Sequence, residues 1–173
     1  MENVSLTPLR EFSRNYRNEI LAFEQNIINN LQMELSSTKE TSSLKIKYPI
    51  EQYTRRGNII GDALLLDGEN IVAVLEIKHR TLPPRDLEHI KRDLKKSVTF
   101  FDAYYGILIW AAAENNCSYY NYKVNSNEWV DGISFEVILK DLSDYVSNVK
   151  KKDDCKVDDI SLLKNEIIKC LDA

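Results

Sequence analysis

Two carboxylates and one ammonium group stand close together in the sequence, at the ends of two short apolar runs. Asp62 precedes the run Ala63–Leu66, and Glu76 and Lys78 follow the run that begins at Ile71. In an extended strand successive side chains point to opposite faces, so Glu76 and Lys78 lie on the same face. Charged groups at the end of a buried strand are costly unless they are paired or bound to a metal. These three residues are therefore our first candidates for a functional site.

This combination of groups has a known chemical use. Two carboxylates can share a Mg²⁺ ion that keeps several of its waters. The metal lowers the pKa of a bound water and offsets the charge of a phosphodiester. An adjacent lysine can orient the attacking water or stabilise the charge that develops. The alternative interpretation is a structural salt bridge at the strand end, in which Lys78 pairs with Glu76 or with Asp62.

A hairpin must bring Asp62 opposite Glu76 for such a site to form. The four residues between the apolar runs, Asp67–Asn70, are typical of a turn. A loop formed by the last three of them, with Asn70 in the left-handed conformation, would place Asp62 opposite Glu76. A two-residue loop would place Asp62 opposite Leu75, on the wrong face. We therefore expect the three-residue loop.

The second run of this hairpin is apolar on both faces, which is typical of a central strand covered on both sides. Apolar periodicity predicts helices over residues 9–35, 84–104, 134–149 and 158–171. Alternating or continuous apolar runs predict further strands over 44–50, 106–111 and 119–124. The expected order is helix, strand, hairpin, helix, strand, strand, which indicates an α/β fold with additions after residue 124.

One acid of the first predicted helix also needs an explanation. Glu24 falls within the apolar arc of this helix, between Ile20, Ile27 and Leu31. An acid that faces the core needs a partner or a metal. We expect Glu24 to lie near Asp62; the alternative is that it sits at the helix edge and pairs with a lysine.

Composition limits the class of protein. The chain has 173 residues, a net charge of −4, 43% hydrophobic residues and 29% charged residues. We assign residues 1–150 to one domain with its own core, and 151–173 to a charged linker and a C-terminal helix. The three cysteines show no metal-ligand spacing, and no Gly-rich motif indicates a phosphate-binding loop. No apolar run approaches the ~20 residues that span a membrane, so we expect a cytoplasmic protein.

The pattern Asp62…Glu76-Ile77-Lys78 resembles the signature of the PD-(D/E)XK nuclease superfamily. That signature is an Asp at a strand start and a Glu-x-Lys on the next strand. Gly61 stands where the family often has its proline. The first helix, through Glu24 and the apolar residues that follow it, is similar to the opening helix of the N-terminal nuclease domain of type I restriction enzyme motor subunits. The resemblance covers roughly residues 9–124.

This resemblance implies a restriction-endonuclease-like α/β core, with a mixed central sheet of about four to five strands flanked by helices. It implies a Mg²⁺-dependent endodeoxyribonuclease, with Mn²⁺ as a substitute, in a restriction, defence or repair setting. Asp62, Glu76 and the Ile77 carbonyl would hold the metal. Lys78 would position or activate water, and Glu24 would complete the site through a water.

Five basic residues near these motifs are candidates for contact with the nucleic-acid backbone: Arg55, Arg56, His79, Arg80 and Lys91. One subgroup of the family carries a glutamine on the helix after the active-site strand, and Lys91 is its nearest stand-in. The alternative for each basic residue is simple solvation.

The net charge of −4 does not favour DNA at long range, so binding would depend on a few local cations or on a partner. One alternative function is a catalytically inactive nuclease-fold module for binding or regulation, and another is an enzyme that acts on RNA or a repair intermediate, which the sequence does not separate from one that acts on duplex DNA. The C-terminal helix would pack on the domain, on a second copy of the chain or on another protein.

Overall fold

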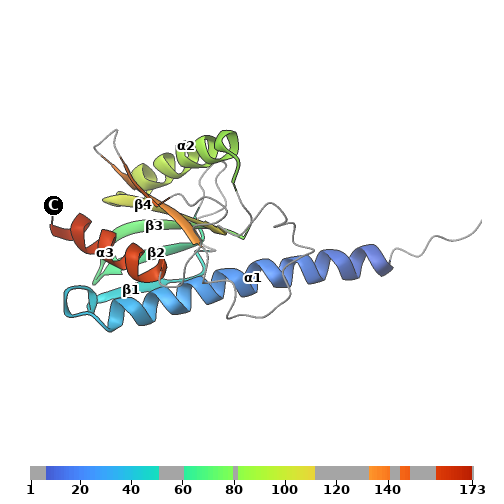
Figure 1. The fold of residues 1–173 in the computed structure, drawn as a ribbon, viewed down its shortest axis with the longest axis horizontal. Coiled ribbons are helices and arrows are strands. Elements are labelled where there is room, and N and C mark those ends of the chain that lie inside the picture. The colour runs from blue at the N-terminus through green and yellow to red at the C-terminus, as the bar shows by residue number, and fades with distance from the viewer. Residues whose placement is uncertain are drawn as a thin grey trace, which may run out of the picture.

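A computed structural model of the chain describes residues 7–50, 61–79, 82–111, 133–140, 145–148 and 159–172, without the side chains of 7–16, 19 and 145–148 (Figure 1). The helices are α1 (Thr7–Ser36), the short 3₁₀ helix η1 (Lys39–Thr41), α2 (Pro84–Phe100) and α3 (Asp159–Asp172). The strands are β1 (Leu44–Lys47), β2 (Ala63–Asp67), β3 (Asn70–Lys78), β4 (Tyr105–Ala111), β5 (Ile133–Leu139) and β6 (Tyr145–Asn148).

The strands form one mixed sheet in sequence order, from β1 to β6. Every neighbouring pair is antiparallel except β3 and β4, which are parallel and joined through α2. The expected α/β fold with a mixed sheet flanked by helices is therefore confirmed. The described sheet has six strands, more than the four to five expected.

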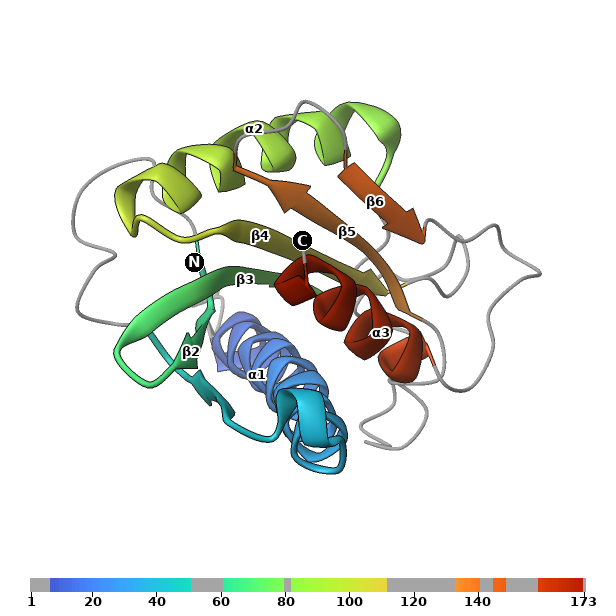
Figure 2. The ribbon, with the colours of Figure 1, turned by 90° about the vertical axis from the view of Figure 1, so that its left-hand side faces the viewer.

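Helices cover both faces of this sheet (Figure 2). α1 and α3 pack on one face, and their apolar side chains join those of the strands in a cluster that includes Phe23, Leu31, Leu75, Ile107, Phe135 and Leu163. α2 packs on the opposite face, in a second cluster that includes Val74, Leu94, Val98, Leu108 and Trp110. β3 and β4 lie between the two clusters, which explains why both strands are apolar on both faces.

The helix expected over residues 134–149 is wrong, because the described part of this segment forms β5 and β6. Apolar residues at spacings of three and four, such as Phe135 and Ile138, suggested a helix. The same residues alternate in the folded sheet, where Phe135 belongs to the α1 and α3 face and Ile138 to the α2 face. Pairing with β4 along its whole length decided between the two patterns. The strand expected over 119–124 lies outside the described residues.

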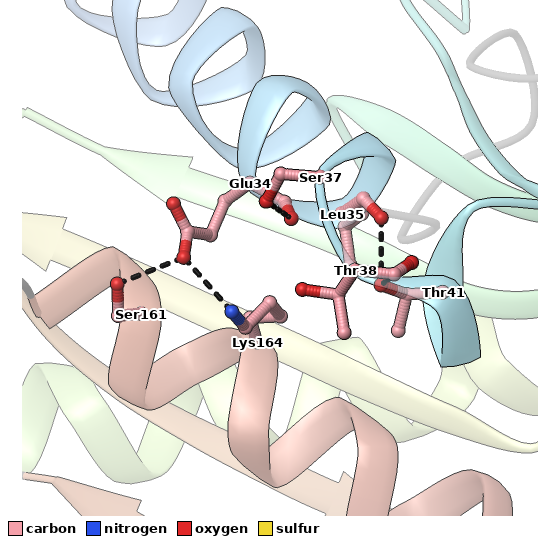
Figure 3. A network of polar contacts seen from close by, with 7 residues as sticks. All are labelled: Glu34, Leu35, Ser37, Thr38, Thr41, Ser161 and Lys164. Carbon is pink, nitrogen blue, oxygen red and sulfur yellow. Dashed lines mark hydrogen bonds and ion pairs between the residues drawn. The ribbon is translucent and has the colours of Figure 1, made fainter.

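α3 packs on the rest of the domain, against α1 and β5. One end of this contact is polar: Glu34 Oε1 accepts hydrogen bonds from Ser161 Oγ and Lys164 Nζ, both at 2.9 Å (Figure 3). On the α1 side of the same region, Thr41 Oγ1 donates to the Leu35 carbonyl at 2.7 Å, which satisfies one of the last carbonyls of the helix. No helix in the described part of the chain combines the length and apolarity needed to cross a membrane.

Candidate active site

The hairpin between β2 and β3 differs from the one expected, although it reaches the expected result. Asp67 pairs with Asn70, so the loop has two residues, and Gly68 takes the left-handed conformation with φ of 61°. The expected three-residue loop with a left-handed Asn70 is wrong. Glycine has no Cβ and adopts positive φ at less cost than asparagine, which explains why the turn is centred on Gly68.

A β-bulge corrects the register that the short loop would impose. Leu65 pairs with Ala73 but Leu66 pairs with Ile71, so Val72 is an extra residue on β3. From this point the register is the one needed, with Ala63 opposite Leu75. The inference that a two-residue loop would carry Asp62 to the wrong face is therefore wrong, because the bulge shifts the pairing back by one residue.

Asp62 consequently lies beside Glu76. Its backbone N–H donates to the Leu75 carbonyl at 2.7 Å, and its Oδ2 accepts from the Ile77 N–H at 2.6 Å. These two contacts lie on either side of Glu76 along β3, and they fix both the backbone and the side chain of Asp62. The arrangement places two carboxylates at the same end of the central hairpin.

Gly61 allows the chain that leads to Asp62 to lie close to β3. A Cβ on Gly61 would lie 2.9 Å from Val74 Cγ1 and 3.3 Å from Ile50 Cδ1. The first distance is shorter than real Cβ atoms show, so a side chain here would push against the middle of β3. The absence of a side chain lets the strand carrying Asp62 pack closely on the strand carrying Glu76.

Lys78 lies on the same face as Glu76, as the alternation of β3 predicts. Its Nζ is 2.9 Å from Glu76 Oε1. The Glu76 side chain is only 6% exposed, whereas that of Lys78 is 34% exposed. The pair therefore presents its ammonium group toward solvent and keeps its carboxylate in the interior.

The pKa values of the carboxylates in this site are raised, so their charged forms are disfavoured. Burial raises the pKa of Asp62, and the charges of Glu76 and Glu24 raise it further, against the hydrogen bond from Ile77 and the charge of Lys78. Burial also raises the pKa of Glu76, although Lys78 opposes this shift through its charge and its hydrogen bond. One lysine thus lies near the buried carboxylate of Glu76 and the half-buried carboxylates of Asp62 and Glu24, which is an environment that favours binding of a cation.

Glu24 belongs to α1, which precedes the hairpin in the sequence, and it lies near this site in the fold. Burial raises the pKa of Glu24, and the charge of Glu76 adds to this effect. Its carboxylate is held by an aromatic hydroxyl: Tyr48 Oη donates to Glu24 Oε2 at 2.9 Å. Glu24 is therefore close enough to the carboxylates of the hairpin to interact with them electrostatically, as expected, and its partner is a tyrosine where the alternative was a lysine at the helix edge.

Tyr48 is the residue of this region that the sequence did not reveal. It follows β1 and continues its alternation after Leu44 and Ile46, so it was interpreted as one more apolar position. Burial raises the pKa of the Tyr48 phenol, and the charges of Glu24 and Asp62 raise it further. The signal available in the sequence was its hydroxyl, because a tyrosine that is partly buried usually needs a hydrogen-bond partner.

The five basic candidates for phosphate contacts have different outcomes. Arg55, Arg56 and Arg80 lie outside the described residues. His79 and Lys91 are each only 6% exposed. A side chain that contacts a phosphate of a large substrate must reach the surface, so neither of these two is placed for that role in this conformation.

Lys91 needs the clearest correction, because it belongs to a buried ion pair. Its Nζ lies 3.1 Å from Glu136 Oε2 on β5 and 3.1 Å from Glu88 Oε1 on its own helix. The Glu136 side chain is 2% exposed and that of Glu88 is 65% exposed. The basic side chains of α2 that do face solvent include Arg85, Arg92, Lys95 and Lys96.

The donor groups of the site fit a hard divalent cation. Asp62 and Glu76 offer carboxylate oxygens and Ile77 offers a backbone carbonyl, and these are the ligands that Mg²⁺ prefers. Among the described residues no group of three or more His, Cys, Asp or Glu side chains is spaced to hold a metal. Because Mg²⁺ keeps several waters and is commonly bound through one or two carboxylates, a pair of acids is sufficient.

Neither the family models, nor the curated proteins, nor the solved structures with which the chain was compared give a match.

Proposed function

We propose that this protein is a Mg²⁺-dependent nuclease that hydrolyses phosphodiester bonds of DNA, in a restriction, defence or repair setting. The observation that carries the proposal is the arrangement of Asp62 beside Glu76, with the ammonium of Lys78 on Glu76. A buried and a half-buried carboxylate with raised pKa values, side by side at one end of the hairpin, are costly to the fold, and such costs are concentrated at functional sites.

Each residue has a role that follows from its position. Asp62, Glu76 and the Ile77 carbonyl would hold the metal, which lowers the pKa of water and offsets phosphodiester charge. Lys78, the exposed member of its pair, would orient the attacking water or stabilise the negative charge that develops on the phosphate. In the reaction the water oxygen bonds to phosphorus, the bond from phosphorus to the leaving oxygen breaks, and that oxygen takes a proton.

A second candidate function is a nuclease-fold module that binds or regulates without catalysis. The observation that favours it is the weak provision for substrate: the chain has a net charge of −4, and both described basic candidates, His79 and Lys91, are buried. A nuclease must therefore rely on cations outside the described residues, on the exposed face of α2 or on a partner. An inactive module has no need to bind Mg²⁺, so metal binding separates the two functions.

The test is incubation of the purified protein with supercoiled, linear and single-stranded DNA, in Mg²⁺, Mn²⁺ or EDTA. Cleavage should require the metal, and Asp62→Ala or Glu76→Ala should each lower it by more than about 100-fold, the upper range for loss of an outer partner of a metal site. Asp67→Ala is the matched control, since Asp67 is an exposed carboxylate of the same hairpin. Both site variants should keep the wild-type circular dichroism spectrum.

Two results would overturn the nuclease assignment. The first is unchanged nicking of the plasmid by both Asp62→Ala and Glu76→Ala. The second is a wild-type protein that neither cleaves DNA nor binds it at low salt with Ca²⁺ in place of Mg²⁺. The second result, together with absent metal binding, would favour the inactive module.

A further inference from the structure

α1 and β1 are fastened to one another by polar contacts at two levels. The lower level is Gln32 of α1, whose Oε1 accepts from the Ile46 N–H at 2.8 Å and whose Nε2 donates to the Leu44 carbonyl at 3.1 Å. β1 is an edge strand, so these backbone groups would otherwise lack a strand partner. The amide of Gln32 therefore sets the position of α1 along β1.

The upper level is the contact between Tyr48 and Glu24. Tyr48 stands two residues beyond Ile46, and Glu24 stands two helical turns before Gln32. The two contacts therefore follow one another along α1 and along the β1 segment that it covers. Tyr48 Oη donates to Glu24 Oε2 at 2.9 Å, and the ring of Tyr48 packs against the apolar cluster of the α1 and α3 face.

This upper contact lies within electrostatic reach of the carboxylate site. The charge of Asp62 acts on Tyr48, and the charge of Glu24 acts on Asp62. The raised pKa of the Tyr48 phenol keeps it protonated, so it remains a donor wherever Glu24 is ionised. A glutamate on an open helix surface would sample several rotamers, whereas here one oxygen is held by a ring that is itself packed.

We propose that Tyr48 is a positioning residue that fixes the Glu24 carboxylate beside the site formed by Asp62 and Glu76. This inference rests on the proposed nuclease function, and it deepens it by assigning a residue outside the Asp, Glu and Lys pattern. Tyr48 acts through Glu24 and not on the substrate. Its effect should therefore appear in the affinity of the site for its cation, and it should vanish when Glu24 is removed.

The test compares the full-length wild type with Tyr48→Phe, which loses only the hydroxyl. Affinity for Mn²⁺ is measured by calorimetry without nucleic acid, and the Mg²⁺ concentration for half-maximal cleavage is measured on plasmid DNA. We expect Tyr48→Phe to weaken both by about tenfold, the lower end for an outer partner of a metal site, with a smaller change in the maximal rate. Tyr105→Phe is the matched control, because Tyr105 is 2% exposed and its hydroxyl has no hydrogen-bond partner among the described residues.

A double-variant cycle decides whether Tyr48 works through Glu24. Tyr48→Phe should add nothing to the loss caused by Glu24→Ala, since both variants remove the same interaction. Glu24→Gln sets the scale of the effect, because it keeps the side-chain shape and removes the charge held by Tyr48, and Tyr48→Phe should not lower the affinity further than this variant does.

The possible results distinguish the role of Tyr48 from the proposed nuclease function. A wild type that cleaves DNA and binds Mn²⁺, with Tyr48→Phe unchanged in both, overturns the role of Tyr48 and leaves the nuclease standing. A further loss on adding Tyr48→Phe to Glu24→Ala also overturns that role alone. A wild type that neither binds Mn²⁺ nor cleaves overturns both proposals.

Discussion

Two lysine–glutamate pairs lie on the same face of the sheet and differ in which member is buried. Glu76, Leu108 and Glu136 are neighbours in register across β3, β4 and β5. In the first pair the Glu76 side chain is 6% exposed and that of Lys78 is 34% exposed. In the second pair Lys91 and Glu136 are both buried, at 7% and 2%. The same two residue types are thus used in two different environments.

The difference between the pairs lies in the balance of buried charge. Lys91 is enclosed with one buried carboxylate, and its second acid, Glu88, reaches solvent. Lys78 stands at the surface above a buried Glu76, with Asp62 alongside. The buried charges of Lys91 and Glu136 neutralise each other, whereas the site of Lys78 keeps more carboxylates than cations. Burial of an ion pair is therefore a weak sign of function, and an uncompensated excess of one charge near solvent is a stronger one.

The largest effect on stability should come from breaking the enclosed pair. Lys91→Met removes the cation and leaves Glu136 buried without it, which should lower the free energy of unfolding by about 3–5 kcal/mol. Lys78→Met should cost less, because Lys78 is partly exposed, and it should instead lower the rate of cleavage. Urea unfolding followed by circular dichroism measures both changes.

The double variant Lys91→Met with Glu136→Leu is the control for this comparison. Replacing both members of a buried pair with apolar groups is often neutral or stabilising, so the double variant should recover most of the loss. A single Lys91→Met variant within 1 kcal/mol of the wild type would contradict the distinction between the two pairs.

The parts of the fold that the sequence predicted are those set by local periodicity. The three long helices follow from apolar residues at spacings of three and four, and they begin and end close to the predicted residues. The shared face of Glu76 and Lys78 follows from the alternation of a strand. Both properties are fixed by near neighbours in the sequence, so no tertiary information was needed.

The parts that the sequence did not predict depend on pairing between distant segments. The bulge at Val72 falls inside a continuous apolar run, where an extra residue leaves no mark on the pattern. Lys91 is a candidate for phosphate contact only through the resemblance to the nuclease family, and the sequence gives no sign of its partner Glu136, which lies in a segment predicted as a helix. Once β5 pairs with β4, Glu136 turns toward α2 and the two charges meet. The burial of Lys91 therefore depends on a strand pairing that local periodicity does not reveal.

The second largest effect on stability should come from removing one charge of the carboxylate site. Asp62→Asn should stabilise the metal-free protein. The raised pKa of Asp62 means that the folded protein binds its proton more tightly than the unfolded chain. Between the ordinary pKa of about 3.9 and the raised value, the folded state holds more protons, so stability falls as pH rises. Asparagine removes this loss, and its side-chain oxygen can still accept from the Ile77 N–H.

Thermal melts in EDTA at pH 5 and pH 8 measure this prediction. The melting temperature of Asp62→Asn should exceed that of the wild type by a few degrees at pH 8, at about 2–4 °C per kcal/mol, and by less at pH 5. Addition of Mn²⁺ should raise the melting temperature of the wild type and leave that of Asp62→Asn unchanged. Asp67→Asn, at the exposed end of β2, should match the wild type throughout. A lower melting temperature for Asp62→Asn at pH 8 in EDTA would show that no excess charge is stored there.

The smallest effect should come from a third lysine–glutamate pair, which lies at the margin of the α1 and α3 contact (Figure 3). Lys164 and Ser161 lower the pKa of Glu34 through their hydrogen bonds. This contribution to stability is therefore present above the ordinary pKa and is lost as pH falls through the lowered value.

The side chains of Glu34 and Lys164 are 31% and 15% exposed, so solvent and salt screen their interaction. Lys164→Ala should lower the free energy of unfolding by about 0–1 kcal/mol, less in 1 M salt, and leave Mn²⁺ binding unchanged. Lys169→Ala, from an exposed pair on the same helix, corrects for the helix propensity of the new alanine. If Lys164→Ala costs as much as Lys91→Met, exposure does not determine the strength of these pairs, and the contrast between Lys78 and Lys91 would need another cause.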